Sequence, residues 1–253
     1  MRLLKKFFEK IQVNTNSELA QLRKRVALLE KSNKKRNFTE SELNELIQDQ
    51  KFLLNCITDL LDLSEDEEIY YYIAKKLSVI VPGSIIIVNS YNNETEESQI
   101  RSIIASKWLL NKTIKILGSD PRDMKFRIQG DDKKQLLEQQ LVTGPKGVSE
   151  LSAGKIPPGI GEVVDKLLGI HKIYGMGFSW RGVVYGNAVI ITRDGKDIEK
   201  KEFVETFIGQ VSIVLQRQKA EMQLHQTLEY LNEAEQIGKI GYWHHDLISD
   251  IVW

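Results

Sequence analysis

The clearest alternation of hydrophobic and polar positions lies between Ile170 and Gly195. Two strand-like runs are separated there by Arg181 and Gly182, which predicts a β-hairpin. In the first run, one face would carry Tyr174, Met176, Phe178 and Trp180, and the other Ile173, Gly175, Gly177 and Ser179. The returning run, residues 183–192, is almost entirely apolar or small, so we expect a central strand covered on both faces.

A heptad spacing of apolar residues predicts two long helices with coiled-coil character. The first begins near Thr39, which forms a capping-box pattern with Glu42, and runs to about residue 61. Its seam positions are Leu43, Leu46, Gln50, Leu53, Ile57 and Leu60. The second, residues 197–235, begins at a capping Asp197 and has Phe203, Phe207, Val211, Val214 and Leu215 along one side. A shorter seam occupies residues 17–30.

The segments between the long helices alternate between strand and helix patterns. A capping box at Ser64 and Glu67 opens a helix over residues 65–80, and a β-branched hairpin follows at residues 84–91 and 99–106. Further helices are expected at residues 107–118, 132–140 and 159–168, with short strands at residues 125–128 and 148–151.

Composition narrows the possible partners and compartments. The 253 residues carry 35 basic and 35 acidic side chains, so no overall field favours nucleic acid. The longest apolar run, residues 79–88, is broken by Pro82 and Gly83 and is far short of the roughly 20 residues of a membrane span. We therefore expect a cytoplasmic chain. Residues 1–13 fit a helix on a membrane surface or, preferably, one that packs on a partner or frays.

The residues that most often carry catalysis or bind metals form no recognisable set. None of the four histidines has a partner at the spacing of a catalytic triad or metal site, and a single cysteine excludes a multi-cysteine zinc site. His225 lacks the acidic residue and proline that follow a phospho-acceptor histidine in kinases. We therefore expect no enzyme activity in this chain. Cys56 could hold haem or sense oxidation, but a buried small apolar residue is the preferred interpretation.

Aromatic residues around the predicted sheet suggest a ligand pocket. The candidate walls are Trp108, Phe126, Tyr174, Phe178 and Trp180, with Arg127 as an anion clamp. Core packing is the alternative explanation for each of the aromatic residues. Gly175, Gly177 and Gly186 either let a ligand approach the backbone or let a helix lie against the sheet, and the sequence favours neither.

Several of these segments together resemble the GAF domain, a small-molecule sensor module of signalling proteins. The resemblance covers about residues 52–218 and rests on the strand at residues 84–91, on residues 174–178, on Gly182 and on Tyr185, Gly186 and Asn187. Residues 118–128 and 154–170 look like the variant found in sensor histidine kinases of methanogenic archaea. The tail from Leu231, with Ile240, Gly241, Tyr242, Trp243 and Asp246, resembles the start of a PAS domain.

This resemblance implies an α+β fold, with a central antiparallel sheet of five or six strands that has helices on one face and a ligand pocket on the other. It divides the chain into an N-terminal helix or coiled coil (1–37), a GAF-like sensor domain with its leading helix (38–218), a signalling linker helix (219–236) and the truncated start of a PAS-like domain (237–253). The two long helices, residues 39–61 and 197–235, would pack on the back of the sheet and form a homodimer.

The predicted function is that of a sensory input module. It would bind a small effector, or receive a conformational signal, and relay it through the helical linkers to a histidine-kinase-type output. The alternative is a ligand-free dimerisation scaffold of a signalling protein. No cofactor is evident, although haem remains a possible one.

Overall fold

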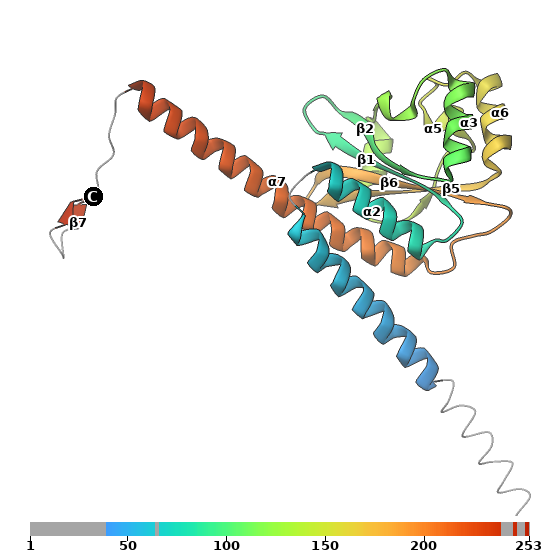
Figure 1. Ribbon diagram of the computed structural model, residues 1–253, viewed down its shortest axis with the longest axis horizontal. Helices are drawn as coiled ribbons and strands as arrows, with labels where there is room; N and C mark the ends of the chain where they lie inside the picture. Colours follow the sequence, from blue (N-terminus) through green and yellow to red (C-terminus); the bar gives the residue numbers. More distant parts are fainter. Residues whose placement is uncertain (1–38, 64–65, 239–244, 247–250, 253) are drawn as a thin grey trace, which may run out of the picture. The chain divides into compact units, whose positions relative to one another are not determined.

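A computed structural model describes residues 39–63, 66–238, 245–246 and 251–252 (Figure 1). The chain divides into two compact units, residues 1–55 and 56–253. In the first unit the described residues, 39–55, are helical, as the heptad spacing predicts. The helix or coiled coil expected over residues 1–37 and the cap expected at Ser64 lie outside the described residues.

The second unit is built on a six-stranded antiparallel sheet with the strand order β3-β2-β1-β6-β5-β4. The strands are β1 (Ile85–Asn92), β2 (Glu97–Ile104), β3 (Lys125–Arg127), β4 (Val142–Thr143), β5 (Ile170–Trp180) and β6 (Val183–Arg193). The predicted α+β class with a six-stranded antiparallel sheet is therefore confirmed. β1 and β6 are central, which explains their apolar composition.

The hairpin of β5 and β6 has the register expected from its alternation. Tyr174 pairs with Ile190, and Trp180 pairs with Val183 across the turn. Both turn residues have positive φ, 49° at Arg181 and 80° at Gly182. This is the backbone of a tight two-residue turn whose twist matches that of the strands, so glycine at residue 182 avoids strain.

Helices cover both faces of the sheet (Figure 1). One face contacts α2 (Asp66–Ile80) and α7 (Lys201–Gly238). The other is covered by α3 (Lys107–Leu117), α4 (Gly130–Leu137), α5 (Val148–Leu151) and α6 (Pro158–Leu168), of which α4 contacts β5 and β6 and α6 contacts both α3 and α5. A short 3₁₀ turn, η1 (Pro121–Asp123), precedes β3.

Two local predictions were wrong. Residues 148–151, expected as a strand, form the helix α5, and the short strand lies earlier, at β4. The Val148 amide donates to the Asp165 carboxylate of α6, which caps this helical turn. Asp197 does not begin the last helix, because α7 starts at Lys201. Its carboxylate instead accepts hydrogen bonds from Lys172 at 2.7 Å and Tyr174 at 3.0 Å.

The 38-residue helix α7 has two different halves. Its first half buries Val204, Phe207, Ile208, Val211, Val214 and Leu215. Gln218 then donates to the carbonyl oxygens of Leu60 and Leu63 at 3.2 and 3.0 Å, which ties α7 to residues 60–63 at the end of the preceding helix. Residues 219–236 are all exposed. The tail contributes a small antiparallel pair, β7 (His245–Asp246) and β8 (Ile251–Val252); whether it begins a PAS domain stays a prediction.

Candidate functional site

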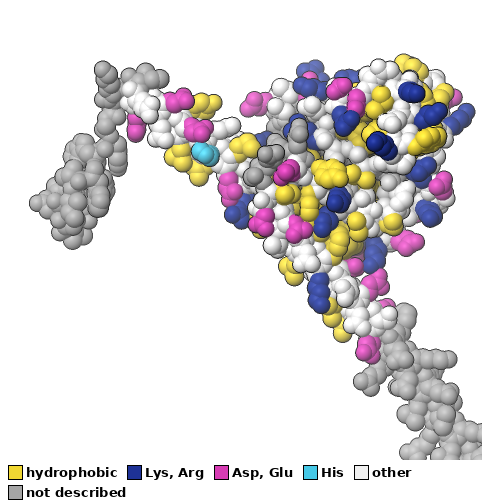
Figure 2. All heavy atoms as spheres, in the orientation of Figure 1, with side chains coloured by type: hydrophobic (Ala, Val, Ile, Leu, Met, Phe, Trp, Pro, Cys, Tyr) yellow, Lys and Arg dark blue, Asp and Glu magenta, His cyan; other side chains and the backbone are white. Residues whose placement is uncertain are grey.

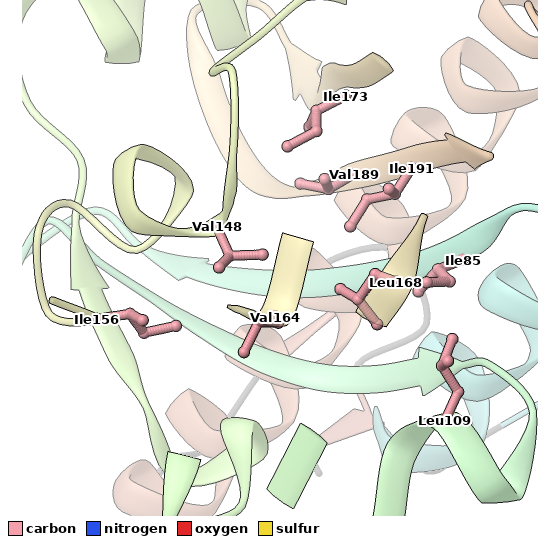
Figure 3. Packing of buried hydrophobic residues seen from close by; sticks show 9 residues of the cluster. All are labelled: Ile85, Leu109, Val148, Ile156, Val164, Leu168, Ile173, Val189 and Ile191. Atoms are coloured by element: carbon pink, nitrogen blue, oxygen red, sulfur yellow. The ribbon is translucent and has the colours of Figure 1, made fainter. Parts of the chain in front are cut away.

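A cavity of about 560 Å³ lies on the face of the sheet opposite α2 and α7. It is bounded by residues of β1, β2, β5 and β6 and by residues from α3 to α6. One part of its wall is a cluster of buried aliphatic side chains, drawn in Figure 3: Ile85, Leu109, Val148, Ile156, Val164, Leu168, Ile173, Val189 and Ile191. Cavities that bind small organic ligands measure about 300–1,000 Å³ and are mostly apolar, so this one has suitable size and lining.

Three buried polar side chains on the sheet interrupt this apolar lining. The Asn89 Nδ2 donates to the Asn187 Oδ1 at 3.2 Å, and the Ser98 hydroxyl donates to the same oxygen at 3.3 Å. Asn89 and Asn187 are each 6% exposed, and Ser98 is 1% exposed. The Asn89 Oδ1 has no hydrogen-bond partner. A buried carbonyl oxygen without a hydrogen bond lowers the stability of the folded state by roughly 1–3 kcal/mol. The unpaired Asn89 oxygen therefore requires an explanation.

Charged side chains border the cavity only at exposed positions. These are Arg127 at the end of β3, Asp132 in α4 and Glu150 in α5. No buried residue of the lining is ionisable apart from Tyr174. The inner cavity is therefore a neutral environment, in which an ionised ligand group would lose its hydration without meeting an opposite charge.

The strand glycines have different structural roles. A Cβ on Gly177 would lie 2.0 Å from the Leu136 carbonyl oxygen, so glycine at this position lets α4 rest on β5. A Cβ on Gly186 would lie 2.2 Å from the Asn89 carbonyl oxygen. A Cβ on Gly175 would meet nothing within 4 Å, and this residue lines the cavity. Gly177 thus permits helix packing, whereas Gly175 leaves open space.

The turn between β1 and β2 holds the start of α4 at the edge of the cavity. The Glu96 carboxylate pairs with Lys133 of α4 at 3.0 Å and accepts a hydrogen bond from Gln129 at 2.7 Å. The hydrogen bond from Lys133 is the main reason that the pKa of Glu96 lies below its ordinary value. The Tyr91 hydroxyl donates to the Ile128 carbonyl at 3.1 Å, which fixes the segment between β3 and α4.

On the opposite face, β5 is joined to the segment that leads into α7. The Tyr174 hydroxyl donates to Asp197, and the Lys201 ammonium of α7 lies 5.3 Å from the Tyr174 ring centre. Hydrogen bonds from Lys172 and then Tyr174 lower the pKa of Asp197, and burial is the main cause of the raised pKa of Tyr174. His171 is also close, with its Nε2 3.4 Å from Asp197.

The six ligand-wall residues expected from the sequence are divided by the structure. Phe126, Arg127 and Tyr174 border the cavity, although the Tyr174 hydroxyl is turned away toward Asp197. Phe178, Trp180 and Trp108 do not border it. Phe178 is fully buried, and its ring lies near Gly186. Trp108 is 61% exposed, with the Lys112 ammonium 6.0 Å from its ring centre. Contact of any of the six with a ligand stays a prediction.

Sequence reasoning missed the polar residues Asn89, Ser98 and Asn187. The available signal was their position, because Asn89 follows the apolar run 85–88 and Asn187 precedes the run 188–191. A polar residue within a strand buried on both faces requires a partner or a ligand. These residues, rather than the aromatic ones, identify the polar part of the site.

Cys56 is buried, at 1% exposure, in the helix that precedes α2. Desolvation raises the pKa of its thiol, which disfavours the reactive thiolate form. In the described parts of the chain, no three His, Cys, Asp or Glu side chains gather as a metal site, and no helix there is long and apolar enough to cross a membrane.

Comparisons with known proteins give similar structures only. No protein-family model matches the chain, and no curated protein matches it significantly. The GAF domain of the Acinetobacter phosphoenolpyruvate-protein phosphotransferase aligns over 68% of this chain and 94% of its own, with 12% identity and a TM-score of 0.48. The corresponding Coxiella burnetii domain covers 70% and 98% at 12% identity and a TM-score of 0.48.

A third similar structure is the phycoerythrobilin-bound GAF domain of a cyanobacterial phytochrome, which covers 69% of this chain and 97% of its own at 10% identity and a TM-score of 0.48. At such identities and scores, the likeness by itself establishes neither family membership nor activity. A function must therefore be argued from the cavity and from its buried polar residues, Asn89, Ser98 and Asn187.

Proposed function

We propose that this chain is a GAF-type sensory input module that binds a small effector in the cavity and transmits its occupancy through α7. One observation carries the proposal: the cavity and the buried half of α7 lie on opposite faces of the same two strands, β5 and β6. A ligand that shifts these strands would also shift the surface on which α7 packs. The chain has no catalytic role of its own in this proposal.

The coupling route runs along β5. Adjacent residues of a strand point to opposite faces, so Ile173 borders the cavity while the Tyr174 hydroxyl holds Asp197 ahead of α7. A change in the position of Ile173 is passed across one peptide bond to the segment from which α7 starts. The proposal therefore needs only a small displacement within the sheet and two alternative packings of α7.

The exposed half of α7 would pass the signal to a second copy of the chain. Hydrophobic side chains, drawn in yellow, are visible along this half of α7 in Figure 2. Apolar residues follow heptad steps on the side of the helix away from the sheet: Ala220, Leu224, Leu231 and Ala234, which continue the spacing from Ile213 in the first half. Among them Leu224 is 61% exposed and Leu231 is 54% exposed. We propose a parallel homodimer through residues 197–235 together with residues 39–61, where Leu43 and Leu46 are also exposed.

The wider context of the module is proposed from the sequence resemblance. The output would be of the histidine-kinase type in a two-component protein, and the residues after α7 would open a PAS-like domain. The variant of GAF domain would be the one found in methanogenic archaea. The ligand-free scaffold is the second candidate, favoured by the exposed leucines of α7 but not by an open cavity.

Native mass spectrometry of the purified full chain, before and after denaturation, tests the proposal. We expect the wild type to release a small molecule and the Gly175→Leu variant to release none, because the leucine side chain would occupy the open space beside Gly175. The Asn111→Ala variant, changed at an exposed position of α3, is the control and should retain the molecule. A wild-type chain that is always empty would favour the scaffold.

A further inference from the structure

We infer that the cavity takes a neutral ligand with an apolar body and an amide-like group, which offers both a hydrogen-bond donor and an acceptor to Asn89 and Asn187. The inference rests on the proposed function and names the chemistry of its effector. Three observations support it: the unfilled hydrogen-bonding groups of the two asparagines, the confinement of charge to the rim and the aliphatic walls.

In the two asparagine amides, one oxygen and one nitrogen make no hydrogen bond to a described residue. The Asn89 Oδ1 accepts no hydrogen bond. The Asn187 Oδ1 is occupied by Asn89 and Ser98, and its Nδ2 makes no hydrogen bond to another described residue. Rotating both amides by half a turn would exchange nitrogen and oxygen at each position and would again leave one oxygen and one nitrogen without a hydrogen bond. The demand for both kinds of group is therefore independent of the amide orientation.

The charges around the cavity argue against an ionised ligand. Arg127, Asp132 and Glu150 are exposed, so each keeps its hydration, whereas the two asparagines are buried. An anion placed against Asn89 would face an unfilled carbonyl oxygen without a buried cation to compensate it. A neutral amide can hydrogen-bond to the Asn89 oxygen and the Asn187 nitrogen without burying an uncompensated charge. The anion clamp expected of Arg127 is the competing outcome.

The remaining contacts would be apolar. Ile173, Val189 and Ile191 of the sheet face Val148, Val164 and Leu168 of the helices across the cluster in Figure 3. A ring system or a branched aliphatic group would fill this space, and the amide-like group would lie on the asparagines. Lactams, cyclic imides and purine-like heterocycles have this combination of a neutral apolar frame and an adjacent donor and acceptor.

Three bicyclic probes of nearly equal size test the inference by isothermal titration with the full chain. They are 2-quinolinone, which carries a lactam; naphthalene, which carries no polar group; and 2-naphthoate, which is an anion. We expect 2-quinolinone to bind about tenfold more tightly than naphthalene, the effect of one or two net hydrogen bonds, and 2-naphthoate to bind most weakly.

Substitutions on the sheet locate the preference. Leucine is close to asparagine in volume. In Asn89→Leu, the affinity for 2-quinolinone should therefore fall to within about twofold of the affinity for naphthalene, which should still bind. Ser98→Ala keeps both amides and should reduce the preference for 2-quinolinone over naphthalene about threefold. This variant provides the test if Asn89→Leu does not fold. Asn111→Ala should change nothing. An advantage that survives in both sheet variants would overturn the inference, as would tightest binding of 2-naphthoate with its loss in Arg127→Ala.

The Gly175→Leu variant separates this inference from the proposed function. If naphthalene binds the wild type and Gly175→Leu prevents it, the cavity is a ligand site, and a missing advantage of 2-quinolinone then overturns only the ligand chemistry. If Gly175→Leu leaves the binding of every probe unchanged, or no probe binds the wild type at millimolar concentration, the assignment of the cavity fails together with the inference.

Discussion

At the scale of single residues, polarity in an unexpected place is more informative than aromatic content. Asn89 and Asn187 adjoin the apolar runs of β1 and β6, residues 85–88 and 188–191, and the Asn89 amide oxygen is unpaired. The aromatic residues were less informative because alternation places Phe178 on the face of β5 that contacts α7, away from the cavity, and turns the Tyr174 hydroxyl toward Asp197 on that same face. A sequence shows which residues share a face of a strand, but not which face is left partly open.

Gly175 and Gly177 make a matched pair for a stability measurement. We expect Gly177→Ala to lower the free energy of unfolding by about 1–3 kcal/mol, because its Cβ would overlap the Leu136 carbonyl and push α4 off the sheet. Gly175→Ala should be neutral or stabilising by up to about 1 kcal/mol, since its Cβ enters open space and the unfolded chain loses freedom. Urea denaturation measures both. Equal effects at the two positions would contradict the assigned roles.

The carboxylate of Asp197 predicts a dependence of stability on pH. Hydrogen bonds from Lys172 and Tyr174 lower its pKa in the folded state below the ordinary value of 3.8. A depressed pKa stabilises the folded state fully above about pH 4, and this stabilisation is lost as the pH falls through the folded-state pKa. Thermal melts should therefore show Asp197→Asn less stable than wild type at pH 7, with the difference shrinking below pH 4. Since this carboxylate is exposed, the effect should also weaken in high salt.

At the scale of helices and strands, long periodic segments were predictable and short ones were not. The β5–β6 hairpin and the last helix follow from alternation and heptad spacing that extend over many residues. Residues 148–151 were assigned wrongly because four residues hold too little periodicity, and their helical turn depends on Asp165, a contact that is distant in sequence. The start of α7 was misplaced for a similar reason, since Lys172 and Tyr174 engage the carboxylate expected as its cap.

Proline substitutions should separate the two halves of α7. Leu215→Pro falls in the buried half, where we expect a loss of about 3 kcal/mol or more in the free energy of unfolding. Thr227→Pro falls in the exposed half and should lower the helical circular dichroism while leaving the urea midpoint of the sheet domain unchanged. A large shift of that midpoint in Thr227→Pro would show that the exposed half supports the domain directly.

At the scale of the whole molecule, the sequence predicted the kind of sheet and the long helices, and the structure adds where the open space lies. No spacing in the sequence reveals that Gly175 faces a void while Gly177 faces a helix, because both occupy the same face of β5. Only the packing of α4 against Gly177 distinguishes them. A cavity is a property of several elements together, and it depends on side chains that are far apart in the chain.

The proposed dimer can be tested with substitutions on opposite sides of α7. Leu224→Glu together with Leu231→Glu places like charges along the outer seam and should raise the dissociation constant of the dimer at least tenfold. Met222 is 47% exposed but lies on the other side of the helix, so Met222→Glu is the matched control and should leave the dimer intact. Sedimentation equilibrium measures both. A dimer that resists the double change must use another surface.

The open space beside Gly175 also affects how the shape of the cavity can change by mutation. A single base change turns any glycine codon into one for alanine or valine, and at this position the new methyl groups would extend into empty volume rather than into the backbone of a neighbour. Under the proposed function, such a change would exchange one effector for a smaller one in a single mutational step. The attachment of β5 to α7 lies on the reverse side of the sheet, so the proposed recognition could evolve separately from the proposed output.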